Sequence, residues 1–210
     1  MLRSSLYFAF PQFGLALVQS APALAISVAA GSAAVTGYTL LMRLFGPFQQ
    51  GQILLLAPVW PAYTEAHARG DHSWVSRTFW RTAGAFVALA TGVAGFAWKS
   101  PAILRLWIGP AAAFTGYGLV ALTAAWCVLQ MAAQPLIYYL IGVGRLHRLA
   151  WAATPGLVIS ASALFLASRT GTVNGVLLAG SAGLAIALLP ALGWQTVRSL
   201  GEHERGGLPT

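Results

Sequence analysis

The stretch Val173–Val197, VNGVLLAGSAGLAIALLPALGWQTV, contains no charged side chain. A helix needs roughly 20 apolar residues to cross a bilayer core of about 30 Å, and this stretch is long enough. Similar apolar runs precede it along most of the chain. Strands of a membrane β-barrel would alternate between apolar and polar residues, and these runs do not. The sequence therefore predicts an all-α polytopic membrane protein.

The predicted spans are about 6–29, 33–60, 78–98, 114–143, 149–167 and 173–197. They form one six-helix transmembrane lobe over 1–198, and a short polar cytoplasmic tail follows over 199–210. The first run resembles a signal peptide, with Ala23–Leu24–Ala25 like a cleavage site. Because the apolar run continues to Ala30 and contains Pro11 and Gln19, we interpret it as a retained helix.

Composition supports a membrane location. Apolar residues make up 58% of the 210 residues and charged residues 8%. A typical soluble domain is about 25% charged, so a soluble fold would have too few charges to cover its surface. The net charge of +8 comes from basic residues between the apolar runs, which argues for orientation in a bilayer and against nucleic-acid binding. The lone Cys127 excludes an internal disulfide and is expected to pack.

Lys and Arg residues in the short loops predict the orientation, because cytoplasmic loops carry an excess of them. With the N-terminus inside, the cytoplasmic side holds Arg3, Arg69, Arg77, Arg81, Arg145, Arg148, Arg198 and Arg205. The outer side holds Lys99, Arg105 and Arg169. Most tryptophans also fall near predicted span ends, as interfacial residues do. Both termini are therefore expected in the cytoplasm.

Polar residues inside the spans are costly, so they mark candidate functional faces. Three spans carry a polar stripe at helical spacing: Gln12 and Gln19 in the first; Thr36, Thr39, Arg43 and Gln50 in the second; Thr123, Gln130, Gln134 and Tyr138 in the fourth. Proline is expected to interrupt the second span at Gly46–Pro47, to end or bend it again at Pro61, and to break the fourth at Pro135. These spans should face something wet or polar, while the others face lipid or each other.

Arg43 is the sharpest of these signals. An arginine at mid-span costs about 2.5–3.5 kcal/mol on insertion scales. No Asp or Glu lies in any predicted span to pair with it. A water-filled cavity or an anionic ligand is the natural partner, and snorkelling to an interface is the structural alternative. For the glutamines, the alternative is an interhelical hydrogen bond of about 0.6 kcal/mol without further function.

Several motifs resemble one family. The run Trp60-Pro-Ala-Tyr-Thr-Glu-Ala66, followed by Arg69-Gly-Asp71 and Trp74, resembles the elbow after the second helix of the C-terminal lobe in bacterial polysaccharide (O-antigen type) flippases. These belong to the multidrug/oligosaccharidyl-lipid/polysaccharide exporter superfamily. Weaker matches, in the same order along the chain, are Gly31–Val35 with Tyr38 and Arg43–Phe45, Ile103–Gly109, and Gly171–Val176.

The resemblance implies movement of a lipid-linked oligosaccharide across the bacterial inner membrane by alternating access. It covers nearly the whole chain but only the C-terminal lobe of the family, so a fragment, a truncated product or a half-transporter is expected. The expected partners are the lipid-linked oligosaccharide, membrane lipids, and an N-terminal lobe or a second copy of the chain. The candidate cavity-lining residues are Gln12, Gln19, Thr39, Arg43, Gln50, Gln130 and Gln134.

Three other functions remain open at this point. A drug or metabolite exporter of the same superfamily would favour an acidic residue in its cavity, and none is present in the spans. A non-transporting partner within a polysaccharide assembly is a further alternative. A membrane glycosyltransferase or acyltransferase needs Asp, Glu or His in an outer loop, and the predicted outer loops at 31–32, 99–113 and 169–172 contain none. We therefore expect no enzyme, no cofactor and no metal.

Overall fold

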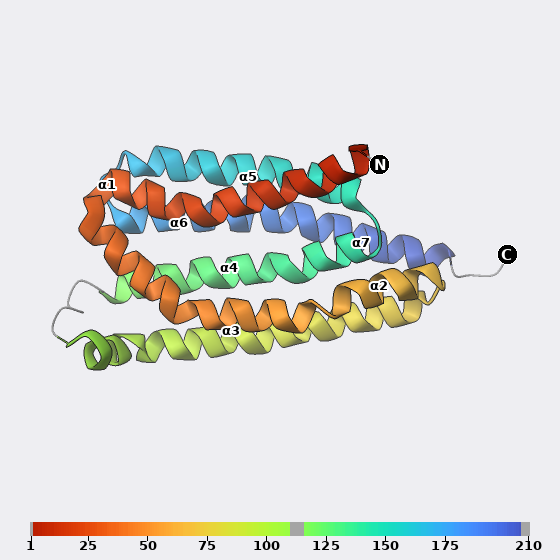
Figure 1. The fold of residues 1–210 in the computed structure, drawn as a ribbon, viewed down its shortest axis with the longest axis horizontal. Helices are drawn as coiled ribbons and strands as arrows, with labels where there is room; N and C mark the ends of the chain where they lie inside the picture. Colours follow the sequence, from red (N-terminus) through yellow and green to blue (C-terminus); the bar gives the residue numbers. More distant parts are fainter. Residues whose placement is uncertain (1, 110–115, 207–210) are drawn as a thin grey trace.

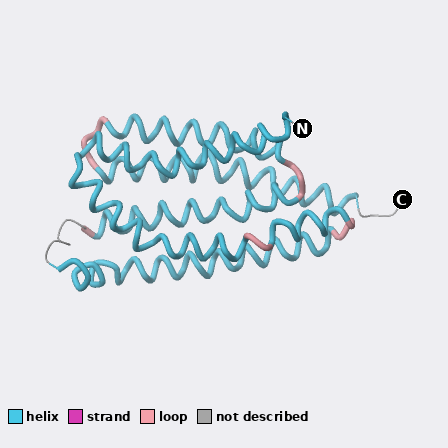
Figure 2. Tube along the Cα trace, in the orientation of Figure 1, coloured by secondary structure: helices cyan, strands magenta, loops and turns pink. Residues whose placement is uncertain are grey.

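The computed structural model describes the backbone of residues 2–109 and 116–206, and the side chains of 19–106 and 116–201. This part of the chain is helix joined by short turns (Figure 2). The elements, in chain order, are α1 (Leu2–Leu56), α2 (Val59–Ala68), α3 (His72–Ile108), α4 (Tyr117–Gly142), α5 (Leu146–Ser168), α6 (Val173–Gly183), the π-helical turn η2 (Leu184–Leu188) and α7 (Leu189–Gly206). They lie roughly along one long axis (Figure 1).

The first two predicted spans correspond to two helical legs of α1 that meet at a sharp kink. Inside α1 the backbone leaves helical geometry at Gly31, with φ 79° and ψ −176°. A side chain would strain this conformation, which glycine adopts freely. Figure 1 shows α1 running to one end of the bundle and then turning back, so that it has a first leg before Gly31 and a second leg after it.

Five helical stretches of the described residues are long and apolar enough to cross a membrane, rather than six separate ones. They are Gln19–Ala68, His72–Leu106, Tyr117–Gly142, Leu146–Ser168 and Val173–Gly201. The first of these stretches runs through the kink at Gly31, so it holds the end of the first predicted span together with the second. Phe114, at the predicted start of the fourth span, lies outside the described residues.

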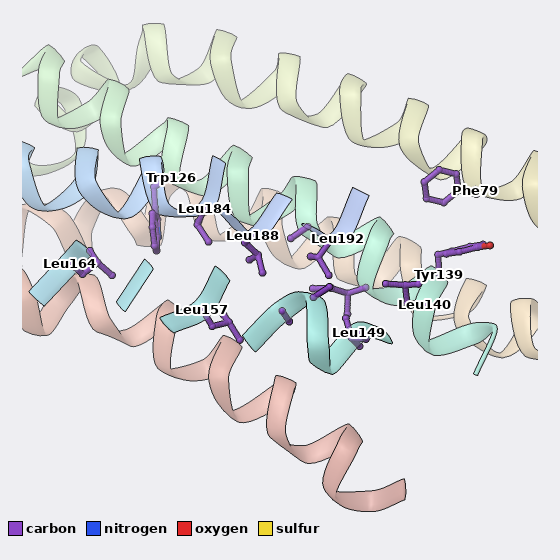
Figure 3. Packing of buried hydrophobic residues seen from close by; sticks show 14 of the residues in the cluster. Phe79, Trp126, Tyr139, Leu140, Leu149, Leu157, Leu164, Leu184, Leu188 and Leu192 are labelled. Carbon is purple, nitrogen blue, oxygen red and sulfur yellow. The ribbon is translucent and has the colours of Figure 1, made fainter. Parts of the chain in front are cut away.

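The bundle has two sides with α4 between them. The first leg of α1 lies with α5, α6 and α7 on one side, and the second leg lies with α2 and α3 on the other (Figure 1). One hydrophobic cluster joins α4 to α5, α6, η2 and α7, and Leu157 of α5 lies among Leu184, Leu188 and Leu192 there (Figure 3). A second cluster joins α4 to α3 and the second leg through residues such as Phe45 and Val93.

Small residues allow α5 and the α6–η2 segment to pack closely. A Cβ added at Gly156 of α5 would lie 2.7 Å from Leu188 Cα, and one added at Gly183 of α6 would lie 2.8 Å from Ser160 Cα. Helices in membranes associate through such close backbone contacts because lipid provides little hydrophobic drive between them. Many large apolar side chains elsewhere are exposed, for example Val28 at 76% and Ile186 at 77%. In water such a surface would be a liability, whereas in lipid it is the expected outer surface.

The two ends of the bundle differ in charge. The start of α1, the α2–α3 and α4–α5 turns and the end of α7 lie at one end, and the reversal in α1 and the α5–α6 turn lie at the other (Figure 1). Arg69, Arg77, Arg145 and Arg148 belong to the turns of the first end or the helix starts beside them. Arg169 belongs to the α5–α6 turn. The first four arginines thus lie at the end formed by the predicted cytoplasmic loops, and Arg169 lies at the end formed by the predicted outer loops.

At two of the prolines where an interruption was predicted, the helix continues. The backbone of α1 stays helical through Gly46–Pro47, and α4 stays helical through Pro135. At Pro61 the prediction is corrected in position, because the break falls at Ala57–Pro58, between α1 and α2. Pro61 itself lies in the first turn of α2, where a missing N–H removes no helical hydrogen bond.

The α2–α3 turn is held by its own polar residues. Asp71 caps α3 by accepting the N–H of Trp74 at 3.0 Å and the hydroxyl of Ser73 at 2.9 Å. These hydrogen bonds, with the first the stronger influence, hold the pKa of the Asp71 carboxyl below its usual range. Glu65 and Arg69 form an exposed ion pair at 2.9 Å. Such a pair contributes little stability.

Candidate functional site: a glutamine-lined cavity

Glutamines from three segments of the bundle line one small cavity, which we call the glutamine cavity. Its volume is about 60 Å³. The lining residues are Gln19 from the first leg of α1, Gln49, Gln50, Gln52 and Ile53 from the second leg, and Gln130, Met131 and Gln134 from α4. Water needs roughly 10–15 Å³ of such volume, so the cavity is large enough for several small polar groups.

Helical geometry explains why these glutamines meet. Gln130 and Gln134 are one turn apart in α4 and therefore share a face. Gln49 and Gln52 are three residues apart in the second leg and share a face in the same way. Because the chain reverses direction at Gly31, the second leg of α1 runs back toward the end of the bundle from which the first leg came. Gln19 of the first leg, the glutamines of the second leg and those of α4 therefore line one cavity.

Gln52 is the most buried of the lining glutamines and has a defined structural partner. Its side chain is 3% exposed, and its Nε2 donates a hydrogen bond to the backbone oxygen of Met131 at 2.9 Å. In a regular helix that oxygen would accept the N–H of the residue four positions on, which here is Pro135. Proline has no N–H, so Gln52 replaces the missing donor across the helix interface.

Two buried amide atoms at the cavity remain without a protein partner. Gln52 Oε1 and Gln130 Nε2 are both buried, and neither has a hydrogen-bond partner among the described residues. Leaving such an atom unsatisfied costs about 1–3 kcal/mol. Because the Nε2 of Gln52 is engaged by Met131, its Oε1 is the end of the amide left for a donor from elsewhere. These two atoms are one acceptor and one donor, and the other lining glutamines add further amide groups.

The cavity carries no formal charge. All of its lining side chains are amides or apolar groups, with Ile53 and Met131 as the apolar part. Within the described residues, no three His, Cys, Asp or Glu side chains come together as a metal site. The arrangement can hydrogen-bond a neutral polar group, but it has no charge to neutralise an ion and no acid or base to transfer a proton.

Arg43 lies on the second leg outside this lining. Its side chain is exposed, and no hydrogen bond or ion pair joins it to another described residue. It is seven residues before Gln50, two turns along the same face, which is a separation of about 10 Å along the helix. The described acidic side chains are engaged at the α2–α3 turn, in the Glu65–Arg69 pair and the Asp71 cap.

The sequence-predicted residues divide into three groups. Gln19, Gln50, Gln130 and Gln134 come together at the cavity, as their stripes suggested. Arg43 and Thr39 lie apart from it, and the Thr39 hydroxyl donates to the backbone oxygens of Val35 and Thr36 at 2.9 and 3.0 Å. The side chain of Gln12 lies outside the described residues.

Two cavity residues, Gln49 and Gln52, were missed by the sequence reasoning. A signal for Gln52 was present, because it continues the buried face of the second leg: Tyr38, Leu41, Phe45, Gln52 and Leu56 are all buried at spacings of three, four or seven. A polar residue on an otherwise apolar helical face marks a buried hydrogen bond or a site. The residues predicted on this helix came instead from its more polar face, which carries Arg43 and Gln50.

Two other residues highlighted by the sequence have structural roles. Thr123 is buried, but its hydroxyl donates to the backbone oxygen of Leu119 at 2.8 Å within its own helix. Cys127 is fully buried, and its sulfur lies 3.7 Å from the sulfur of Met42, which confirms it as a packing residue.

The long apolar helices, the exposed apolar surface and the buried polar cavity together define a polytopic helical membrane protein. No family model matches this chain, and neither a curated protein nor a solved structure matches it.

Proposed function

We propose that this protein moves a lipid-linked oligosaccharide across the bacterial inner membrane by alternating access, with this chain as the C-terminal lobe. The observation that carries the proposal is the convergence of Gln19, Gln50, Gln130 and Gln134 on one uncharged cavity. A glycan presents many hydroxyl groups, and amide side chains can replace the water around them by donating and accepting hydrogen bonds. The family resemblance of the α2–α3 elbow supports the same assignment.

Arg43 fits the other part of such a substrate. A polyprenyl diphosphate is anionic, and a guanidinium binds phosphate oxygens through charge-assisted hydrogen bonds. The arginine is exposed and forms no ion pair with an acidic side chain among the described residues, so its charge is available to a ligand. A drug exporter that selects cations would instead need an acidic group at the cavity.

In the membrane, the two legs of α1 would act as two spans, which gives six crossings with both termini in the cytoplasm. This arrangement is supported by the grouping of basic residues at the end that holds the α2–α3 and α4–α5 turns. It also places the reversal at Gly31 on the outer side.

The exposed polar face of the second leg supports pairing with another lobe. Thr36, Arg43 and Gln50 are all exposed along this face. Hydrocarbon disfavours such a stripe, so we expect an N-terminal lobe or a second copy of the chain to cover it and complete a central cavity. Alternating access would then be a rocking of the two lobes about the shared site.

Complementation tests the function. A bacterial strain lacking its own polysaccharide flippase would express the complete protein, either wild type or with Gln130→Leu and Gln134→Leu together. We expect wild type to restore surface glycan and the double variant to lose most of that activity at equal membrane abundance. Gln195→Leu, a half-buried α7 glutamine outside the cavity lining, is the matched control. Failure of wild type to restore any glycan would refute the proposal.

A further inference from the structure

The hydrogen-bonding inventory of the glutamine cavity restricts what can occupy it. Gln52 Oε1 is a buried acceptor and Gln130 Nε2 is a buried donor, and both lack protein partners among the described residues. The orientation of the Gln52 amide follows from its hydrogen bond to Met131, because only the Nε2 end can donate to a carbonyl oxygen. A ligand group that satisfies both of these atoms must therefore donate to one amide and accept from the other.

Common polar groups differ in this respect. A phosphate or carboxylate only accepts hydrogen bonds, so its oxygens would leave Gln52 Oε1 without a donor. An ammonium only donates, so it would leave Gln130 Nε2 without an acceptor. A hydroxyl group does both, and it brings no charge into a cavity whose lining residues cannot neutralise one.

We propose that the glutamine cavity is a subsite for a neutral hydroxyl-bearing group of the ligand, separate from an anion subsite at Arg43. This inference rests on the proposed function and deepens it, because it assigns the two chemical parts of the substrate to two places on the second leg of α1. Arg43 and Gln50 are two helical turns apart, so the hydroxyl group lies about 10 Å from the anionic group of the same ligand. Water occupies the cavity between transport events.

The apolar residues at the cavity limit the size of that group. Ile53 and Met131 contribute to the lining, and the volume of about 60 Å³ suits one hydroxyl-bearing edge of a sugar ring rather than a whole oligosaccharide. Two of the other lining glutamines, Gln19 and Gln50, are exposed and lie where the rest of a glycan would continue. The cavity would thus bind one sugar next to the lipid carrier and would not discriminate among the sugars farther along the glycan.

Three probes with the same alkyl chain separate these chemistries. The complete protein in nanodiscs would be melted with n-octyl β-D-glucoside, n-octyl phosphate or octyltrimethylammonium, each below its critical micelle concentration, and followed by tryptophan fluorescence. We expect the glucoside to raise the Tm of wild type by about 3 °C when it is in excess over its Kd. Gln130→Leu should abolish that rise, whereas Arg43→Ala and the control Gln195→Leu should keep it. Octyl phosphate should stabilise wild type and lose its effect in Arg43→Ala.

Two results would overturn the subsite. One is a glucoside effect that is absent in wild type or unchanged in Gln130→Leu. The other is stabilisation by octyltrimethylammonium that Gln130→Leu removes. The outcome is separable from that of the proposed function: Gln130-dependent glucoside binding in a protein that restores no glycan would keep the subsite and reject the flippase. Glycan export that needs Gln130, with glucoside binding that does not, would keep the flippase and reject the subsite.

Discussion

Gln52 Nε2 lies 2.9 Å from the backbone oxygen of Met131, at the point where Pro135 leaves α4 without a helical donor. The two residues are 79 positions apart in the chain, so the hydrogen bond joins the second leg of α1 to the central helix of the bundle. The same glutamine lines the glutamine cavity, and its Oε1 is buried without a partner among the described residues. The side chain of Gln52 thus joins α1 to α4 and also lines the candidate site.

The first prediction tests this link. Gln52→Leu should lower the free energy of unfolding by about 1–3 kcal/mol, because the Met131 oxygen is then buried without a donor. Pro135→Ala restores an N–H that can donate to that oxygen within α4. In the Pro135→Ala background, Gln52→Leu should therefore cost clearly less, as measured by thermal melting in detergent with a double-mutant cycle. Equal costs in both backgrounds would show that Gln52 does not replace the donor that Pro135 lacks.

The second prediction concerns the close packing of α5 against η2. Gly156→Ala should destabilise the protein although alanine is the better helix former by about 1 kcal/mol. The added Cβ would lie 2.7 Å from Leu188 Cα, and backbone cannot move aside as a side chain can. Gly84→Ala in α3 is the matched control, because a Cβ there meets nothing within 4 Å. Melting temperatures should fall for the first variant and hold or rise for the second; the opposite order would contradict the packing.

The third prediction is topological. Cysteines introduced at Ser73 and Ser32, both exposed, lie at opposite ends of the bundle, beside the α2–α3 turn and the Gly31 bend. In intact spheroplasts of a Cys127→Ala background, an impermeant thiol reagent should label Ser32→Cys and spare Ser73→Cys. Both should react after the cells are opened. The reverse pattern in intact cells would invert the proposed orientation.

The fourth prediction separates charge from folding at Arg43. Arg43→Ala in the complete protein should keep normal membrane abundance and lose complementation of glycan export, because the anionic group of the substrate loses its counter-charge. Arg43→Lys should recover only part of the activity, since lysine keeps the charge without the bidentate fork. Arg169→Ala, an exposed arginine after α5, is the control and should complement fully. Full activity of Arg43→Ala at normal abundance would remove the anion subsite.

The sequence by itself determined where the apolar helices lie and which faces are polar. The runs around Tyr117–Gly142 and Leu146–Ser168 match the predicted spans to within a few residues, because hydrocarbon imposes a long uninterrupted apolar stretch. Gln130 and Gln134 were found from helical spacing alone, since side chains four apart share a face whatever surrounds the helix.

The prolines show what helical spacing in the sequence does not predict. Pro101 has no N–H to donate to the backbone oxygen of Ala97. That oxygen instead accepts the hydroxyl of Ser100 at 2.8 Å, and this replacement could be predicted because Ser100 directly precedes the proline in the sequence. At Pro135 the donor is Gln52, on another helix, and the break predicted there does not occur. Periodicity reports the direction of a side chain around its own helix axis but not the partner that meets it. Only the tertiary structure decided that Gln52 belongs to the cavity and that Arg43 does not, because both depend on how the reversal at Gly31 places one leg of α1 against α4.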